Sequence, residues 1–183
     1  AFEGCSGLTT VTIGNSVTTI GERAFTSCSG LTTVIWNARN AEYYNGLSYD
    51  SPFSNCDRLT DFVFGEEVEH IPALLCCELA SLKNLVIGNS VTTIGDSAFE
   101  GCTGLITVTI PNSVTEIGAC AFYDCSSLTT VTIPNSVTDI GGEAFSYCTG
   151  LTEVSIPNSI TTIRGGAFEG CSGLTTVTIG NSV

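Results

Sequence analysis

The chain has little positive charge, one histidine and no methionine. Its 183 residues hold 5 Lys and Arg against 18 Asp and Glu, which gives a formal net charge of -13. A surface this acidic repels phosphate backbones, so the composition excludes nucleic-acid binding through a basic footprint. Long apolar runs are also missing, since no stretch approaches the ~18 consecutive apolar residues of a membrane-spanning helix. The hydrophobic fraction of 43% is nevertheless too high for a disordered acidic tail.

Several chemical sites lack their usual sequence signatures. His70 is the sole histidine, so a multi-histidine metal site is excluded, and no CxxC pair indicates zinc. Among the 18 acids, nothing places two carboxylates across a cleft as glycosidase chemistry requires. We therefore expect no enzyme activity, no cofactor and no metal. Because neither an initiator methionine nor a signal peptide is visible, we also expect an excerpt of a longer protein.

A repeat of fixed period runs through the chain. The pattern Leu8-Thr-Thr-Val-Thr-Ile13 recurs at intervals of 23 residues, with one interval of 28 between Leu31 and Leu59. The leucines that begin the units are Leu8, Leu31, Leu59, Leu82, Leu105, Leu128, Leu151 and Leu174. The regular units continue with Gly or Pro followed by Asn-Ser, at Gly14, Gly88, Pro111, Pro134, Pro157 and Gly180, and then with Val-x-x-Ile, Ala-Phe and Cys. A period of this length indicates stacked structural repeats.

Each part of the unit predicts a local structure. Alternating β-branched residues at 10–13 predict a short strand with one buried face, and Pro or Gly with Asn-Ser predicts a turn. Residues 17–20 are candidates for a second short strand, and 24–28 for one helical turn. Pro72 and Arg164 replace the glycine that follows the Ile, so we expect these glycines to provide space rather than a positive φ.

One unit is too small to bury a core of its own, so the units must stack. The sequence therefore predicts a repeat solenoid of leucine-rich-repeat-like type, built mostly of short parallel β-strands with tight turns and short helical turns. We expect one solenoid over residues 1–183, with an irregular unit and an insertion at about 36–56. Both ends fall within a repeat and have no polar cap, which predicts further repeats or end-to-end self-association.

The repeat Leu-x-x-Val-x-Ile-Pro-Asn-Ser-Val-x-x-Ile-Gly-x-x-Ala-Phe-x-x-Cys resembles the BspA-like leucine-rich repeats over essentially the whole chain. The resemblance implies a cell-surface or secreted protein. It also implies a role in adhesion, through binding of host or neighbouring-cell surface proteins. Spacing alone supports only the solenoid.

Seven of the ten cysteines occupy one repeat position: Cys5, Cys28, Cys56, Cys102, Cys125, Cys148 and Cys171. Side chains in such a column run parallel, which disfavours the convergent geometry of a disulfide. We expect buried free thiols that pack as small hydrophobic groups. Cys76 takes the Phe position, whereas Cys77 and Cys120 lie off the column and are free to be exposed or paired.

The irregular unit holds the only tryptophan and three of the five tyrosines. Trp36 takes the position of a core isoleucine and is expected in the core. Tyr43, Tyr44 and Tyr49 have no evident core position. They are candidates for partner binding, because insertions in stacked repeats often bind and tyrosine is frequent in binding hot spots. The alternative is that they cover the core where the unit is deformed.

A second irregularity lies on the outward side of the predicted strands. Where most units carry a polar residue, three successive units carry Ile35, Val63 and Val86, with Asp61 in the neighbouring column. Contiguous exposed apolar surface marks interaction sites, so we expect a protein-binding patch here. The alternative is that the inserted segment covers these residues.

Three functions remain open at this point. The first is a non-enzymatic adhesion or protein–protein interaction module that binds through the outward strand face and the 36–56 loop. The second is ice binding, since four units carry both outward threonines: Thr10 and Thr12, Thr107 and Thr109, Thr130 and Thr132, Thr176 and Thr178. The third is a structural stalk, which has no saturable ligand.

Overall fold

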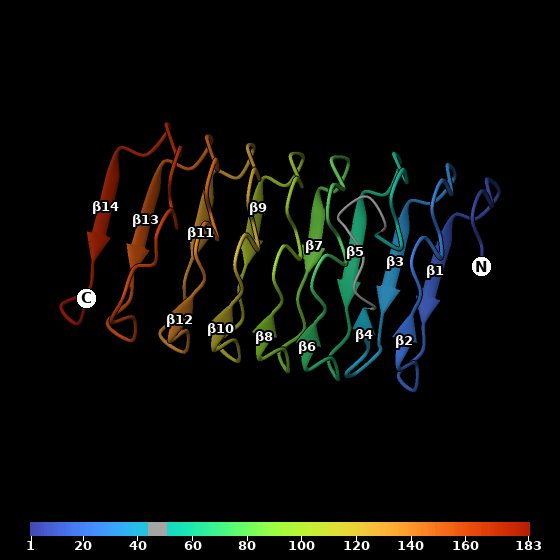
Figure 1. The fold of residues 1–183 in the computed structure, drawn as a ribbon, viewed down its shortest axis with the longest axis horizontal. Helices are drawn as coiled ribbons and strands as arrows, with labels where there is room; N and C mark the ends of the chain where they lie inside the picture. The colour runs from blue at the N-terminus through green and yellow to red at the C-terminus, as the bar shows by residue number, and fades with distance from the viewer. Residues whose placement is uncertain (44–50) are drawn as a thin grey trace.

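The structure is a computed structural model that describes residues 1–43 and 51–183. It is a solenoid in which successive coils stack along one axis, with the two termini at opposite ends (Figure 1). The described residues form fourteen short β-strands and no helix. Each complete coil contributes a segment to two parallel rows of strands and to a ridge of turns. The predicted solenoid of short parallel strands is confirmed.

The first row contains the strands that the Leu-x-x-Val-x-Ile pattern predicts. They are β1 (Thr10–Ile13), β3 (Thr33–Trp36), β5 (Asp61–Phe64), β7 (Asn84–Val86), β9 (Thr107–Thr109), β11 (Thr130–Thr132), β13 (Glu153–Ile156) and β14 (Thr176–Ile179). The 28-residue interval leaves the register intact, since Val34 pairs with Phe62 as Val11 pairs with Val34. The row forms two hydrogen-bonded sheets, β1-β3-β5-β7 and β9-β11-β13-β14.

The second row contains two-residue strands, which lie below the first row in Figure 1. They are β2 (Thr19–Ile20), β4 (Glu42–Tyr43), β6 (His70–Ile71), β8 (Thr93–Ile94), β10 (Glu116–Ile117) and β12 (Asp139–Ile140). This row also divides, into β2-β4 and β6-β8-β10-β12. The second row therefore runs without a break past the gap between β7 and β9.

The ridge of turns differs from the predicted helical turn. Arg23 and Ser27 have φ of 53° and 57°, and a left-handed residue cannot continue a right-handed helix. Backbone bonds to the next coil hold this conformation, with Phe25 N donating to Pro52 O at 2.8 Å. The position of Ser27 is left-handed in every unit: Gly4, Ser27, Asn55, Glu78, Gly101, Asp124, Tyr147 and Gly170. The ridge is thus a third set of inter-coil hydrogen bonds.

The glycines after the second-row strands have the role that the sequence predicts. They do not have positive φ. A Cβ added to Gly95 would lie 2.6 Å from Ala73 N, and one added to Gly141 would lie 2.3 Å from Ala119 N. Both glycines therefore give space for close approach of the preceding coil.

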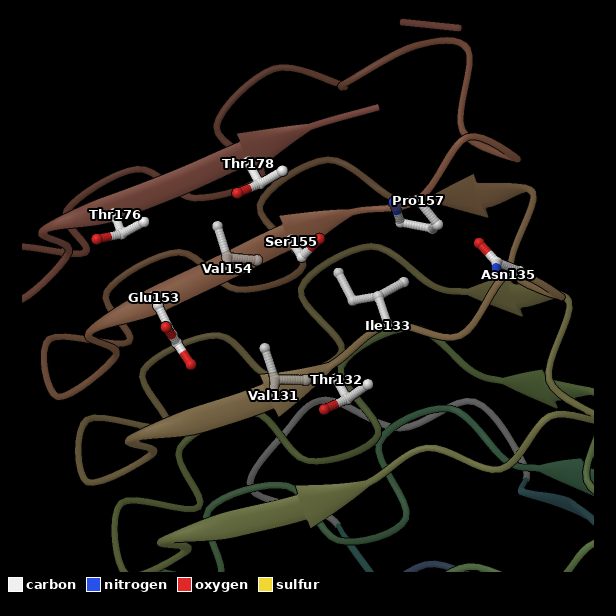
Figure 2. Close-up of a pocket in the computed structure, with 10 residues that line it drawn as sticks. All are labelled: Val131, Thr132, Ile133, Asn135, Glu153, Val154, Ser155, Pro157, Thr176 and Thr178. Atoms are coloured by element: carbon white, nitrogen blue, oxygen red, sulfur yellow. The ribbon is translucent and has the colours of Figure 1, made fainter. Parts of the chain in front are cut away.

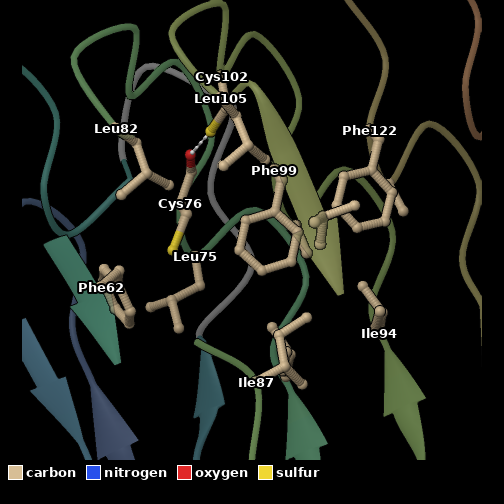
Figure 3. Packing of buried hydrophobic residues seen from close by; sticks show 14 of the residues in the cluster. Phe62, Leu75, Cys76, Leu82, Ile87, Ile94, Phe99, Cys102, Leu105 and Phe122 are labelled. Carbon is tan, nitrogen blue, oxygen red and sulfur yellow. Dashed lines mark hydrogen bonds between the residues drawn. The ribbon is translucent and has the colours of Figure 1, made fainter. Parts of the chain in front are cut away.

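A stack of phenylalanine rings forms the centre of the core. In the C-terminal coils, the centroid of Phe122 lies 5.2 Å from that of Phe99 and 5.2 Å from that of Phe145, with nearly parallel planes. Cys76 interrupts the stack, and aromatic rings from β5 pack beside the gap (Figure 3). There Phe62 packs edge-on against Phe53 at 5.6 Å.

The predicted cysteine column is also present. Six of its thiols are buried, and Cys5 in the first coil is exposed. Each buried thiol donates to a backbone carbonyl of the preceding coil, as Cys125 Sγ does to Phe99 O at 3.3 Å. Burial raises the pKa of Cys56 to about 11 and that of Cys148 to about 12, so these thiols stay protonated at neutral pH. Trp36 is buried as well, which confirms its predicted place in the core.

Candidate partner-binding surface

The outward side of the first row carries the apolar patch that the sequence predicts, made of Ile35, Val63 and Val86. The three residues come from β3, β5 and β7 and lie in register, with Ile35 opposite Val63 and Val63 opposite Val86. Ile35 and Val63 are half-buried, whereas Val86 is 51% exposed. The patch thus becomes more accessible from β3 toward β7.

Asp61 lies at the start of β5, in the outward column next to the patch. Its carboxylate accepts hydrogen bonds from Thr60 Oγ1 at 2.5 Å and from Asn84 Nδ2 at 2.7 Å. These two bonds lower the pKa of Asp61, the Thr60 bond most, because they stabilise the ionised form. A fixed negative charge therefore lies at one end of the patch.

More negative charge lies at the opposite ends of the strands. Glu66 and Glu67 follow β5, are exposed, and line a shallow groove with Asn15 and Asn37. Glu66 Oε2 accepts the backbone N–H of Asn89 at 3.2 Å, which fixes its position. The apolar patch is therefore flanked by carboxylates at both ends of its strands.

A groove opens beside Val86, between β7 and β9, where the first row has no ladder of hydrogen bonds. It has a volume of about 470 Å³. Its lining residues are Leu85, Val86, Ile87, Asn89, Thr109, Ile110, Pro111 and Asn112. We call it the β7–β9 groove. Because Val86 belongs to both features, the apolar patch and the groove form one continuous surface.

Proline explains much of the local geometry. After β3 and β5, the residue that follows the strand donates its N–H to the preceding coil, as Gly65 N does to Trp36 O at 2.9 Å. Pro111, Pro134 and Pro157 occupy this position farther along, and proline has no N–H to donate. The first row therefore loses a hydrogen bond at each proline. Its strands separate beside Pro111 and Pro157, whereas β9 and β11 stay paired beside Pro134.

A second groove of about 390 Å³ lies over β11, β13 and β14 (Figure 2). Here β11 and β13 pair only at Thr130 and Glu153. The lining is more polar than that of the β7–β9 groove, with hydroxyls from Thr132, Thr176 and Thr178. The sequence analysis missed both grooves, although Pro111 after β9 and Pro157 after β13, which line them, were a visible signal.

Of the three tyrosine candidates, the structure describes only the backbone of Tyr43. The backbone of Tyr43 belongs to β4 and pairs with Ile20 of β2, so it lies in the second row. Tyr44 and Tyr49 lie outside the described residues, as does the side chain of Tyr43. The candidate surface therefore rests on Ile35, Asp61, Val63, Val86 and the β7–β9 groove.

His70 lies in β6, paired with Thr93 of β8. Its imidazole is half-buried, and burial lowers its pKa, which favours the neutral form at pH 7. The charges of Glu116 and Glu42 act in the opposite direction. His70 is thus a second-row residue, away from the outward patch of the first row.

Comparison with known proteins agrees with the repeat pattern and the solenoid fold. The sequence model of the BspA type leucine rich repeat region matches residues 1–79 and 69–183, in six copies. The chain belongs to the BspA-type leucine-rich repeat family. No curated protein matches it. Within the described residues, no helix is long and apolar enough to cross a membrane.

Solved structures of leucine-rich repeat proteins share the fold. A leucine-rich repeat protein from Bacteroides ovatus is similar with a TM-score of 0.79 and 28% identity, over 96% of this chain and 46% of that protein. A leucine-rich repeat protein of T. pallidum has a TM-score of 0.68 and 24% identity, over 92% of this chain and 68% of that protein. The chain thus spans less than half of the B. ovatus protein. Leucine-rich repeat proteins generally mediate protein–protein interaction.

Proposed function

We propose that this chain is a non-enzymatic adhesion module of a cell-surface or secreted protein, and that it binds a protein partner through the outward face of β3, β5 and β7. The observation that carries the proposal is the continuous surface formed by the apolar patch and the β7–β9 groove. Exposed apolar surface of this kind is uncommon on soluble proteins unless it binds something.

The partner's chemistry follows from the charges around the patch. Asp61 lies at one end of the strands and Glu66 and Glu67 at the other. The whole chain carries a formal charge of -13, which attracts a cationic partner over distances of about a Debye length, ~8 Å at physiological salt. The surface therefore suits a protein segment that combines apolar side chains, for the patch and groove, with Lys or Arg at its flanks.

Peptide selection tests this surface without knowledge of the natural partner. A displayed library of random peptides is selected on the immobilised chain and counter-selected on the Val86→Lys variant. The enriched peptides should combine apolar residues with Lys or Arg. Their affinity should fall by about tenfold or more in Val86→Lys, a loss of ~1.4 kcal/mol, and should weaken with added salt.

Thr132→Lys is the matched control, because Thr132 occupies the same outward column in β11. The selected peptides should bind this variant and the original chain alike. Val63→Lys extends the test to β5 and should lower affinity without unfolding the chain. Equal binding to all variants, or a selection without enrichment, would contradict the proposed surface.

The adhesion role needs a separate measurement. Fluorescent chain should bind cultured epithelial cells in a saturable manner, and Val86→Lys should lower that binding more than Thr132→Lys does. A stalk predicts no saturable binding. The surface location is tested by proteolysis of intact cells of the source organism, which should release fragments of an exposed protein.

Ice binding has weaker structural support. The exposed threonines of β9 and β11 lie in register, with Thr107 opposite Thr130. The next strand, β13, carries Glu153 and Ser155 instead, and β3 interrupts the array beside β1. A flat ice-binding face needs a longer uninterrupted array, so a thermal-hysteresis measurement should show no activity.

A further inference from the structure

Three potential metal donors converge on the ridge of turns. The ligand atoms of Cys77, Glu78 and Glu100 all lie within 4.8 Å of one another. Cys77 and Glu78 belong to the coil that continues into β7, and Glu100 belongs to the coil that continues into β9. The cluster therefore links the two coils whose first-row strands are not joined by a ladder.

The thiol of Cys77 differs from the thiols of the cysteine column. Its side chain is 0% exposed, yet it lies outside the hydrophobic cluster that forms the core. At the same position of other coils, Thr26 and Ser54 share a hydrogen bond of 3.0 Å and Ser146 Oγ donates to Glu169 O at 3.1 Å. Cys77 Sγ makes no comparable hydrogen bond in the described structure. The Cys77 side chain is thus fully buried, and its sulfur lies within 4.8 Å of a carboxylate oxygen of Glu78 and of Glu100.

The backbone brings the two carboxylates together. Glu78 is left-handed, with φ of 62°, and its N–H donates to Glu100 O at 2.7 Å. Its carboxylate lies over Gly101, where an added Cβ would be 2.9 Å from the carboxylate carbon. Because Gly101 has no side chain, the Glu78 carboxylate has room to lie against the next coil.

The two carboxylates have no cationic partner in the described structure. Its ion pairs join Arg23 to Glu3, Arg39 to Glu69 and Arg164 to Asp139. Glu78 and Glu100 belong to none of them. Two carboxylates this close repel each other, and a bound cation would remove the repulsion.

We propose that Cys77, Glu78 and Glu100 form a binding site for a divalent ion of the zinc class. Thiolate sulfur with carboxylate oxygen is a donor set that Zn²⁺, Co²⁺ and Cd²⁺ accept, whereas Mg²⁺ and Ca²⁺ require oxygen ligands. As the sulfur–metal bond forms, the Cys77 thiol loses its proton to solvent. Three protein ligands leave one tetrahedral position for water. The ion would connect adjacent coils beside the gap between β7 and β9.

Titration of the reduced, native chain with Cd²⁺ tests the site. Binding of one Cd²⁺ per chain should produce an ultraviolet sulfur-to-cadmium charge-transfer band. Cys77→Ser should abolish the band, and its hydroxyl is already accepted at this position as Ser54 and Ser146. Glu100→Gln should weaken Cd²⁺ binding by about tenfold or more. Cys120→Ser is the matched control, because Cys120 is a half-exposed thiol off the column and should leave the titration unchanged.

A band that persists in Cys77→Ser, or its absence from the original chain, would overturn the proposal. A second readout uses Zn²⁺, which should raise the thermal midpoint of the original chain and of Cys120→Ser but not of Cys77→Ser. Ca²⁺ at the same concentration should have no such effect. Far-ultraviolet circular dichroism of each variant checks that the fold is intact. Failure here leaves the proposed adhesion surface unaffected, since the peptide test uses different residues.

Discussion

The coils around β5 and the coils around β11 have the same backbone plan but fill it differently. Around β11 the phenylalanine stack is continuous, and the first-row strands carry valine and isoleucine inward. Around β5 the stack loses a ring at Cys76, and the strands carry Phe62 and Phe64 instead. The comparison shows that each coil keeps its core filled, although different residues fill it in different coils.

The outer surface also changes between these two regions. In both of them, threonine hydroxyls before the first-row strands donate to the preceding coil, as Thr32 Oγ1 does to Thr9 O at 3.1 Å and Thr152 Oγ1 does to Thr129 O at 3.4 Å. Lys83 and Ile106 interrupt this ladder, and Ile106 is 53% exposed. This interruption of the threonine hydrogen bonds lies next to the β7–β9 groove. The repacked core, the missing threonine hydrogen bonds and the candidate binding surface therefore occur in the same part of the solenoid.

The regular stack should be sensitive to loss of a ring. Phe122 is fully buried between two parallel neighbours, so Phe122→Ala removes two ring contacts and leaves a cavity. We expect a loss of about 4 kcal/mol in the free energy of unfolding. Urea denaturation followed by circular dichroism measures it. A loss below 1 kcal/mol would show that the coils collapse around the missing ring.

Restoring the repeat pattern in the irregular coil should destabilise the chain. Cys76→Phe puts the consensus ring where Phe62 and Leu75 already lie close by (Figure 3). Overpacking of this kind costs about 2 kcal/mol. The same denaturation experiment checks it, and a more stable variant would mean that the coil holds unfilled space instead.

The smallest expected effect concerns the threonine ladder. Thr129 Oγ1 donates to Ile106 O at 3.2 Å, so Thr129→Val removes one partly solvated hydrogen bond and should cost about 1 kcal/mol. Ile106→Thr, in the interrupted part, should change stability by less than this because β7 offers no paired strand. If Ile106→Thr raised the free energy of unfolding by as much as Thr129→Val lowers it, the threonine hydrogen bond would also form between the coils of β7 and β9.

Much of this fold was predictable because a fixed period determines which side chains form columns. The offset of each residue from the repeat leucine predicts the register across the 28-residue interval. It also predicts the buried cysteine column and the place of Trp36 in the core. The prediction of a helical turn at 24–28 was wrong because contacts outside the unit determine its backbone conformation. Arg23 and Ser27 take left-handed conformations that backbone bonds to the next coil stabilise, and a single unit does not reveal those bonds.

The candidate site was predictable only in part. Alternation along the strands placed Ile35, Val63 and Val86 in one outward column, and the register agrees. The β7–β9 groove depends on a hydrogen-bond ladder that fails between two particular coils, which is a property of their packing. The burial of Cys77 likewise depends on neighbouring coils, so spacing alone left it open whether this thiol was exposed.

The gap between β7 and β9 also has a mechanical consequence. The strands run across the long axis, so tension along that axis pulls neighbouring coils directly apart. At this junction one of three hydrogen-bonded segments has no ladder, while β8 still pairs with β10 and the ridge bond from Cys76 N to Ala98 O remains. Under load, this junction would therefore yield more easily than the junctions that all three segments join, so a pulled molecule would change shape at the candidate binding surface.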